Sequence, residues 1–227
     1  PVNKLLSPDY AKAIAGKVQS NKTLKPEEYG RFFSKDDGGT SHFSVMDKDG
    51  NCVACTETIN LTFGSFVVVP EYGILMNNQM DDFAADPGKP NAFGLIQSAA
   101  NVIEPGKRPL SSMTPTIVVK DGRAILSAGA SGGPRIITAT LQNILNQLVF
   151  GMNPQQAVSA PRFHHQWSPN ELLLEPQLKA NVGSVLSGFG HQVESASSLA
   201  ASQGTARTDK GLQGGSDPRK HGKPAGW

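Results

Sequence analysis

The stretch Asp37-Gly38-Gly39-Thr40-Ser41-His42-Phe43-Ser44-Val45 decides how this sequence can fold and what it can do. Two flexible glycines lead directly into a threonine that opens an alternating, strand-like segment. If the chain is cut between Gly39 and Thr40, Thr40 carries a hydroxyl nucleophile and a free α-amine on one residue. A threonine hydroxyl is a weak nucleophile, but an adjacent amine with a pKa near neutrality can activate it. The simpler alternative is a Gly-Gly loop that enters an ordinary strand.

The residues after Thr40 predict a β-hairpin. The segments 42–46 and 52–60 alternate as strands do, and they flank the turn sequence Asp47-Lys48-Asp49-Gly50-Asn51. The aspartates of this turn imitate a calcium loop, but their spacing does not fit one and no distal glutamate follows in register. A tight turn with a left-handed Gly50 is therefore the favoured interpretation.

The turn also predicts the register of the two strands. A three-residue loop pairs Asp47 with Asn51, and counting outward from this pair sets Thr40 opposite Thr58. Opposed residues of an antiparallel pair share a face, as do positions two apart, so Thr58 and Asn60 are expected to flank the Thr40 side chain. A two-residue loop would shift the register and remove this inference.

Composition indicates one large globular domain and argues against some partners. The chain has 227 residues, of which 38% are hydrophobic, and its net charge is 21 − 19 = +2. No basic stripe favours nucleic acid, and no apolar run favours a membrane span. No signal peptide is recognised, so any targeting segment is expected upstream of Pro1. The 24 glycines and 16 prolines favour a loop-rich, strand-rich fold over a helical bundle.

Metal and redox chemistry are not expected. Cys52 and Cys55 have C-x-x-C spacing, but on a strand positions three apart face opposite sides, which favours two structural thiols. His164 and His165 are adjacent, and adjacent residues rarely bind one metal together. We therefore predict no metal site and no cofactor.

A polar run and a lid are predicted before the middle of the chain. Strands at 66–69 and 74–76 are followed at once by Asn77-Asn78-Gln79-Met80-Asp81-Asp82-Phe83. Polar loops at strand ends are where sites are usually built. The segment 86–94 is rich in Pro and Gly and is expected to form a lid loop.

The segment Ser131-Gly132-Gly133-Pro134-Arg135 predicts the start of a helix that follows a hairpin at 116–128. Glycines at a strand-to-helix junction leave backbone N–H groups free at the positive end of the helix, which is the chemistry of an oxyanion hole. A plain tight turn is the alternative. The expected core-facing stripe of this helix contains Ile136, Ile137, Leu141, Ile144, Leu145 and Leu148.

Further elements follow from caps and periodicity. We expect helices from Ser7-Pro8 to Val18, from Asn153-Pro154 to before Pro161 and over 176–188, a short turn at 25–28, strands at 191–195 and 205–208, and a polar, glycine-rich tail from Gly211.

Taken together, these segments resemble the γ-glutamyltransferase (γ-glutamyltranspeptidase, glutathione hydrolase) family, in its bacterial type. The similarity covers essentially all of residues 40–227. Pro161–Trp167 (PRFHHQW) and Ser216–Arg219 (SDPR) support it. Four motifs carry it, in order: Thr40–Asp47 (TSHFSVMD), Asn77–Phe83 (NNQMDDF), Arg108–Met113 (RPLSSM) and Ser131–Ile137 (SGGPRII).

The resemblance implies an α+β fold of the N-terminal nucleophile (Ntn) hydrolase type, a four-layer αββα sandwich. It implies a zymogen that cleaves itself between Gly39 and Thr40. Residues 1–39 would be the helical or irregular end of a large subunit, and residues 40–227 the small catalytic subunit. The large subunit of the same precursor would be the partner and would complete the sandwich.

The same resemblance implies a role for each matched residue. Thr40 would attack the γ-carbonyl of a γ-glutamyl amide such as glutathione, and the γ-glutamyl group would pass to water or to an amino acid or peptide. Thr58 would orient Thr40, and the amides of Gly132 and Gly133 would bind the oxyanion. Asn60, Gln79 and Asp82 would hold the α-amino end of the substrate, and Ser111 and Ser112 its α-carboxylate, with an arginine of the large subunit. A periplasmic or extracellular location is implied in the same way.

Two alternatives stay open at this point. A related acylase of the glutaryl or cephalosporin type would act on a substrate that lacks the α-amine and so does not need Asp82. An inactive truncated fragment that serves as a binding module would retain the fold without turnover.

Overall fold

The computed structural model describes residue 3 and residues 7–17, 39–84, 86, 88–89, 91, 95 and 98–226. Backbone contacts divide the chain into two compact units, Pro1–Asp37 and Gly38–Trp227. Within the described residues, no helix has both the length and the apolar character needed to cross a bilayer. Cleavage between Gly39 and Thr40, and with it the division into 1–39 and 40–227, stays a prediction.

The first unit contains helix α2 (Pro8–Ala15). The backbone N–H of Tyr10 donates to Ser7 Oγ over 3.2 Å, so Ser7 is the predicted N-cap and Pro8 takes the first helical position. The predicted end at Val18 and the short turn at 25–28 lie outside the described residues.

A four-stranded antiparallel sheet forms the centre of the second unit, with the order β11-β10-β6-β5. β5 (Thr116–Lys120) and β6 (Arg123–Ser131) form the predicted hairpin. β10 (Ala201–Thr208) begins four residues before the predicted strand, and it pairs with β6 and β11.

Strand β11 (Gly211–Ser216) corrects the sequence prediction of a polar tail. Glycines weaken strands and therefore hide this one from propensity arguments. Tertiary packing explains the glycine at position 215. A Cβ on Gly215 would lie 2.4 Å from the carbonyl oxygen of Pro154, so β11 can lie against α5 (Pro154–Ser159) only with glycine at that position.

Strands β1 (Thr40–Met46) and β2 (Cys52–Thr58) form the predicted hairpin. The Asp47 N–H donates to Asn51 O over 3.0 Å, and Gly50 has φ of 99°. The register sets Thr40 opposite Thr58. The three-residue loop is therefore confirmed, and with it the predicted placement of the two threonines.

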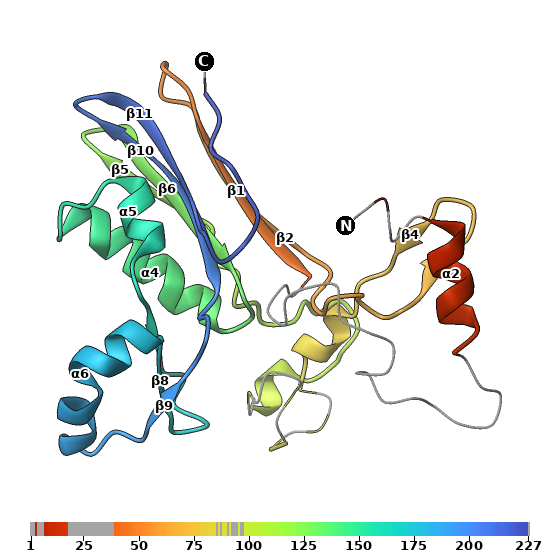
Figure 1. Ribbon diagram of the computed structural model, residues 1–227. Coiled ribbons are helices and arrows are strands. Elements are labelled where there is room, and N and C mark those ends of the chain that lie inside the picture. The colour runs from red at the N-terminus through yellow and green to blue at the C-terminus, as the bar shows by residue number, and fades with distance from the viewer. Residues whose placement is uncertain are drawn as a thin grey trace. The chain divides into compact units, whose positions relative to one another are not determined.

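The hairpin and two helices lie on opposite faces of the four-stranded sheet (Figure 1). Helix α4 (Arg135–Leu148) packs on β6 and β10, and α5 packs on β10 and β11. On the other face, β1 packs on β6 and β10. The second unit is thus built as a helical layer, a sheet and a hairpin layer. Its core includes the buried apolar residues Leu126, Ala128, Ala130, Ile136 and Ala139.

A polar contact fastens the hairpin to the sheet. The buried imidazole of His42 lies against Gly129, where a Cβ would come within 2.2 Å of its ring atoms. Its Nδ1 is 2.8 Å from Thr56 Oγ1 and its Nε2 is 3.0 Å from Ser44 Oγ. Ser127 of β6 donates to Ser44 Oγ over 3.0 Å, so hydrogen bonds cross the interface between the two layers.

Helix α4 turns a different face to the core than its apolar stripe predicts. Its buried residues are Ile136, Ala139, Thr140 and Asn143. The buried Asn143 donates to Ser202 Oγ over 2.8 Å, and this satisfied polar contact orients the helix. Four residues of the predicted stripe are instead exposed: Ile137, Leu141, Leu145 and Leu148.

The hairpin has an uncovered apolar face as well. Phe43, Val45 and Val53 point away from the four-stranded sheet and are 47%, 54% and 48% exposed. The described residues of the Gly38–Trp227 unit place no helical layer over this face.

Shorter elements surround these layers. β3 (Val68–Val69) and β4 (Ile74–Leu75) pair as predicted, and the 3-10 turns η1 (Gln79–Asp82) and η2 (Ala99–Asn101) follow. Helix α6 (Pro176–Gly188) has the predicted bounds. It lies next to a small sheet of β7 (Phe163–His164), β8 (Leu172–Leu174) and β9 (Val193–Ser195).

A buried ionic cluster ties the end of the chain to this framework. Arg162 Nη2 lies 2.6 Å from Asp217 Oδ2, and Arg219 Nη1 lies 3.0 Å from Asp217 Oδ1. Arg219 also pairs with Glu175, whose carboxylate accepts from the N–H groups of Arg162 and Leu199. Because each charge is paired and hydrogen-bonded, removing one partner would leave an uncompensated buried charge.

We expect Gly129→Ala to destabilise the protein by about 1–3 kcal/mol or more, because the added methyl group overlaps the His42 ring. Thermal and chemical denaturation would measure the loss. The control is Gly188→Ala near the end of α6, where an added Cβ meets nothing within 4 Å and alanine favours the helix. Equal stabilities for the two variants would contradict the proposed packing.

Candidate active site

Thr40 lies at the first position of β1 and is only 6% exposed. Its Oγ1 is 2.8 Å from Thr58 Oγ1 across the hairpin. The Asn60 N–H donates to the same Thr58 oxygen over 2.8 Å. The Thr40 hydroxyl therefore belongs to a short chain of hydrogen bonds that fixes its direction.

The residue before Thr40 is held equally closely. The carbonyl oxygen of Gly39 accepts from the Ile59 N–H over 2.9 Å. A Cβ at Gly39 would lie 2.4 Å from the Leu61 carbonyl oxygen, so the backbones approach too closely for a side chain. The peptide group that joins Gly39 to Thr40 is thus polarised by a hydrogen bond and restricted in its movement.

A cavity of about 550 Å³ opens at Thr40. All but one of the residues predicted for catalysis and substrate binding line it, although they come from distant parts of the chain. The exception, Gly132, directly precedes a lining residue. The predicted residues in the lining are Thr40, Thr58, Asn60, Gln79, Asp82, Ser111, Ser112 and Gly133.

Gly132 and Gly133 form the turn between β6 and α4. Their φ values are 137° and 60°, a region that favours glycine. At Gly132 a Cβ would also lie 2.8 Å from Ala200, so a side chain is excluded on two grounds. Within the described part of the chain, neither N–H of this pair donates a hydrogen bond. Successive amides at a helix start are suited to bind negative charge.

Asp82 supplies the negative charge of the cavity. Gln79 Nε2 donates to Asp82 Oδ2 over 2.5 Å, and both residues belong to η1. Burial raises the pKa of the Asp82 carboxyl, the hydrogen bond from Gln79 opposes this effect, and the neighbouring Asp81 adds to it. None of the described lining residues is Lys or Arg, so no basic side chain of the lining pairs with Asp82. A cationic group of a ligand could therefore bind to this carboxylate.

One wall of the cavity was not predicted from the sequence. His164, His165 and Gln166 line it, together with Thr138 of α4. Both ring nitrogens of His164 have partners: Nδ1 is 2.8 Å from Thr138 Oγ1, and Nε2 is 2.9 Å from Gln166 Oε1. The only signal in the sequence was that His164, His165 and Gln166 belong to the motif 161–167. That motif did not indicate that these residues line the cavity.

The described residues contain no group of three or more potential ligand side chains placed to hold a metal.

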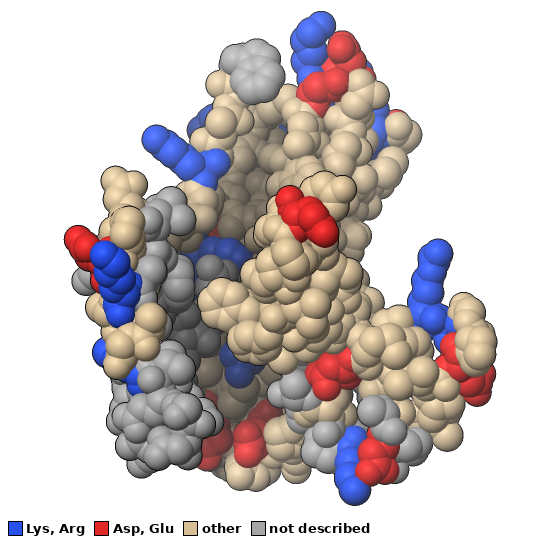
Figure 2. Space-filling view, turned by 90° about the vertical axis from the view of Figure 1, so that its right-hand side faces the viewer, with Lys and Arg blue, Asp and Glu red and all other residues tan. Residues whose placement is uncertain are grey.

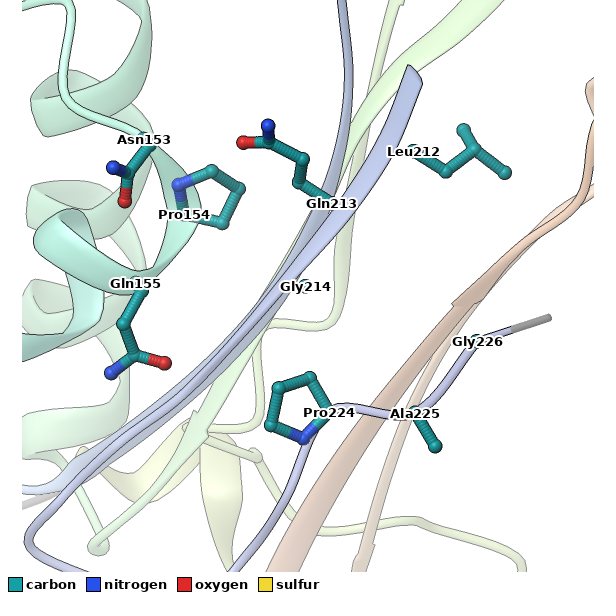
Figure 3. A pocket seen from close by; sticks show the side chains of 9 residues that line it. All are labelled: Asn153, Pro154, Gln155, Leu212, Gln213, Gly214, Pro224, Ala225 and Gly226. Carbon is teal, nitrogen blue, oxygen red and sulfur yellow. The ribbon is translucent and has the colours of Figure 1, made fainter. Parts of the chain in front are cut away.

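A second hollow, of about 420 Å³, lies between the start of α5, β11 and the tail. Figure 3 shows Pro224 of the tail beside Gly214. Its described lining contains no titratable side chain, and so it offers no acid, base or nucleophile. On the face in Figure 2, Lys and Arg are interspersed with Asp and Glu.

Residues 1–227 match the model of the gamma-glutamyltranspeptidase family. The chain belongs to this family. It is 46% identical over 222 residues to a glutathione hydrolase proenzyme of Escherichia coli K12, an alignment that covers 96% of this chain and 38% of the relative. The chain thus spans between about a third and two fifths of the length of this relative and of two others, from Pseudomonas sp. A14 and Schizosaccharomyces pombe.

Solved structures agree with this assignment. A gamma-glutamyltranspeptidase from Pseudomonas nitroreducens is similar with a TM-score of 0.77 and 42% identity, over 82% of this chain and 98% of that chain. A cephalosporin acylase from Bacillus halodurans has a TM-score of 0.71 at 27% identity, over 100% of this chain and 40% of that chain. The α+β, Ntn-hydrolase fold class is therefore confirmed, and the higher identity favours the transpeptidase branch.

His42 gives a pH-dependent prediction. Burial lowers its pKa from 6.5 to about 4. Between these values the unfolded chain binds a proton that the folded protein does not, so stability is complete above pH 6.5 and falls as the pH drops toward 4. The loss is at most about 3 kcal/mol. His42→Gln should flatten the dependence of unfolding free energy on pH across this window.

Exposed His191 provides the control for that measurement. His191→Gln should leave the pH dependence as in the parent protein. An unchanged dependence in His42→Gln would show that His42 is not held neutral by burial.

Proposed function

We propose that this protein cleaves γ-glutamyl amides through an ester on Thr40 and passes the γ-glutamyl group to water or to an amine. One observation carries the proposal: the Thr40 hydroxyl is hydrogen-bonded to Thr58 in a cavity that also contains the Asp82 carboxylate and the Gly133 turn. Nucleophile, anion site and cation site thus face one space. The glutathione hydrolase name of the relatives agrees with this substrate class.

Maturation would use the same hydroxyl. Thr40 Oγ1 would attack the Gly39 carbonyl carbon, and the C–N bond would break as the amine takes up the hydroxyl proton. This acyl shift leaves an ester between Gly39 and Oγ1 and a free α-amine on Thr40, and water would then hydrolyse the ester to the Gly39 carboxylate and the Thr40 hydroxyl. The hydrogen bond from the Ile59 N–H would stabilise the negative charge that develops on the Gly39 oxygen.

Turnover would repeat this chemistry on a substrate. The α-amine of Thr40 would take the hydroxyl proton while Oγ1 bonds to the γ-carbonyl carbon, and Thr58 would hold the hydroxyl in line. The amides of Gly132 and Gly133 would bind the oxyanion. When the C–N bond breaks, the proton passes to the leaving amine. Water or an amino acid then takes the acyl group from the ester in the same manner.

Charge would select the substrate. The Asp82 carboxylate, with Gln79 and Asn60 beside it, suits the α-ammonium of a γ-glutamyl group. The hydroxyls of Ser111 and Ser112 can donate to its α-carboxylate. A hydroxyl pair does not neutralise a carboxylate, and the resemblance implies that an arginine of the large subunit completes this part.

A preceding segment of a longer precursor would be the partner. The exposed apolar face at Phe43, Val45 and Val53 is suited to pack against a further layer, which would complete the αββα sandwich. Three of the relatives are named proenzymes and are much longer than this chain, which supports the same arrangement. A periplasmic or extracellular location stays a prediction from the resemblance.

Thr40→Ala should abolish both maturation and turnover, because it removes the nucleophile of each reaction. Protein expressed from its complete gene would be analysed by intact mass and by release of p-nitroaniline from γ-glutamyl-p-nitroanilide. The parent protein should give two chains separated at Gly39-Thr40, whereas the variant should give one. Thr40→Ser, which retains a hydroxyl, is the control. Turnover by Thr40→Ala, or a parent protein that never matures, would contradict the proposal.

Asp82→Ala should raise KM for γ-glutamyl-p-nitroanilide by roughly ten- to a hundredfold, the loss expected for one hydrogen bond to a charged group. The glutaryl analogue, which lacks the α-amine, should be a poor substrate of both forms and should be little affected by the change. A parent protein that prefers the glutaryl compound would favour an acylase. An unchanged KM in Asp82→Ala would remove this residue from substrate binding.

A further inference from the structure

A lysine from the end of the chain reaches the nucleophile residue. Lys220 Nζ donates to the carbonyl oxygen of Thr40 over 2.7 Å, and it lies 3.4 Å from Ser41 Oγ. The side chain is half-buried. Nearly the whole length of the small-subunit segment separates the two residues in sequence, so this contact is made by the tertiary fold alone.

The tail is anchored firmly enough to make this contact specific. Asp217, three residues before Lys220, is 1% exposed and pairs with both Arg162 and Arg219. Its carboxylate also accepts from the Ser202 N–H over 2.7 Å, and its carbonyl accepts from the Lys220 N–H over 3.2 Å. The turn at 217–220 is therefore tied to β10 and to the chain before β7.

The position of Lys220 puts a positive charge close to where the catalytic base would be. Within one residue the backbone nitrogen and carbonyl oxygen are at most about 3.6 Å apart, so Lys220 Nζ lies within about 6–7 Å of the Thr40 nitrogen. Like charges at this distance disfavour each other. An α-amine at Thr40 would thus be harder to protonate in the presence of Lys220.

We propose that Lys220 is a positioning residue for Thr40, whose ammonium holds the Thr40 carbonyl and by its charge keeps the freed α-amine unprotonated. The inference rests on the proposed function, because the amine exists only after cleavage. An α-amine has an ordinary pKa near 8, so a lower value increases the fraction of free base at neutral pH. The hydrogen bond orients the residue, and the charge tunes its base.

Other ionisable groups surround Thr40, and their effects on its α-amine must be distinguished from the effect of Lys220. On the hairpin these are His42 and the exposed Glu57, which lies opposite Ser41 in the strand register. Facing the cavity are Asp82, His164 and His165, and behind the tail are Asp217 and Arg219, which pair with each other. Burial lowers the pKa values of His42 and His164, so these two imidazoles stay neutral near pH 7. Variants at Lys220 leave all of these groups in place, and a difference between variants reports the lysine.

The test compares kcat/KM against pH for enzyme expressed from its complete gene, with γ-glutamyl-p-nitroanilide as substrate. The acidic limb of this profile reports the essential base of the free enzyme. Lys220→Met should move that limb to higher pH by about one unit. Lys220→Gln keeps a donor without the charge and should move it similarly, whereas Lys220→Arg should restore the parent profile. Lys223→Met, an exposed lysine of the same tail, is the charge-matched control.

The outcomes separate two kinds of failure. A parent enzyme without γ-glutamyl turnover would overturn the proposed function and this inference with it. An active parent whose acidic limb is unmoved in Lys220→Met or Lys220→Gln would overturn the role of Lys220 alone, as would an equal shift in Lys223→Met. If Lys220→Met does not mature, Lys220→Gln is the deciding variant. A lower rate at all pH values without a moved limb would show a structural contact only.

Discussion

The contact of His42 with Gly129 is the constraint on which the site depends. It fixes hairpin β1–β2 on the four-stranded sheet, and the hairpin register then places Thr40 opposite Thr58. Because side chains alternate along a strand, a slip of one residue would turn Thr40 to the opposite face. The imidazole can occupy this position only because Gly129 has no side chain and because Thr56 and Ser44 satisfy both ring nitrogens.

A second constraint joins the end of the chain to the same residue. The buried cluster of Arg162, Glu175, Asp217 and Arg219 orders the tail after β11, and Lys220 follows within it. A cluster of this kind costs desolvation energy and adds little net stability compared with apolar packing, but it specifies one arrangement of the groups it joins. Here the cluster holds the tail in a position beside Thr40.

Much of this arrangement could be predicted from local sequence. The turn Asp47–Asn51 determined the hairpin register, and capping residues determined the starts of α2 and α5. The predictions failed where packing overrides local preference. Strand β11 has glycine at position 215 because α5 approaches it closely there, and α4 turns Asn143 rather than Leu141 to the core because Ser202 offers that amide a partner.

The sequence by itself determined the hairpin, the glycine turn before α4 and eight of the residues that line the cavity, since short-range rules and four ordered motifs suffice for these. Only the tertiary structure decided that Lys220 reaches the Thr40 carbonyl and that His164 and its neighbours form a wall of the cavity. The physical reason is range. Turn geometry and side-chain alternation act over a few residues, whereas contacts between distant segments depend on how whole layers pack.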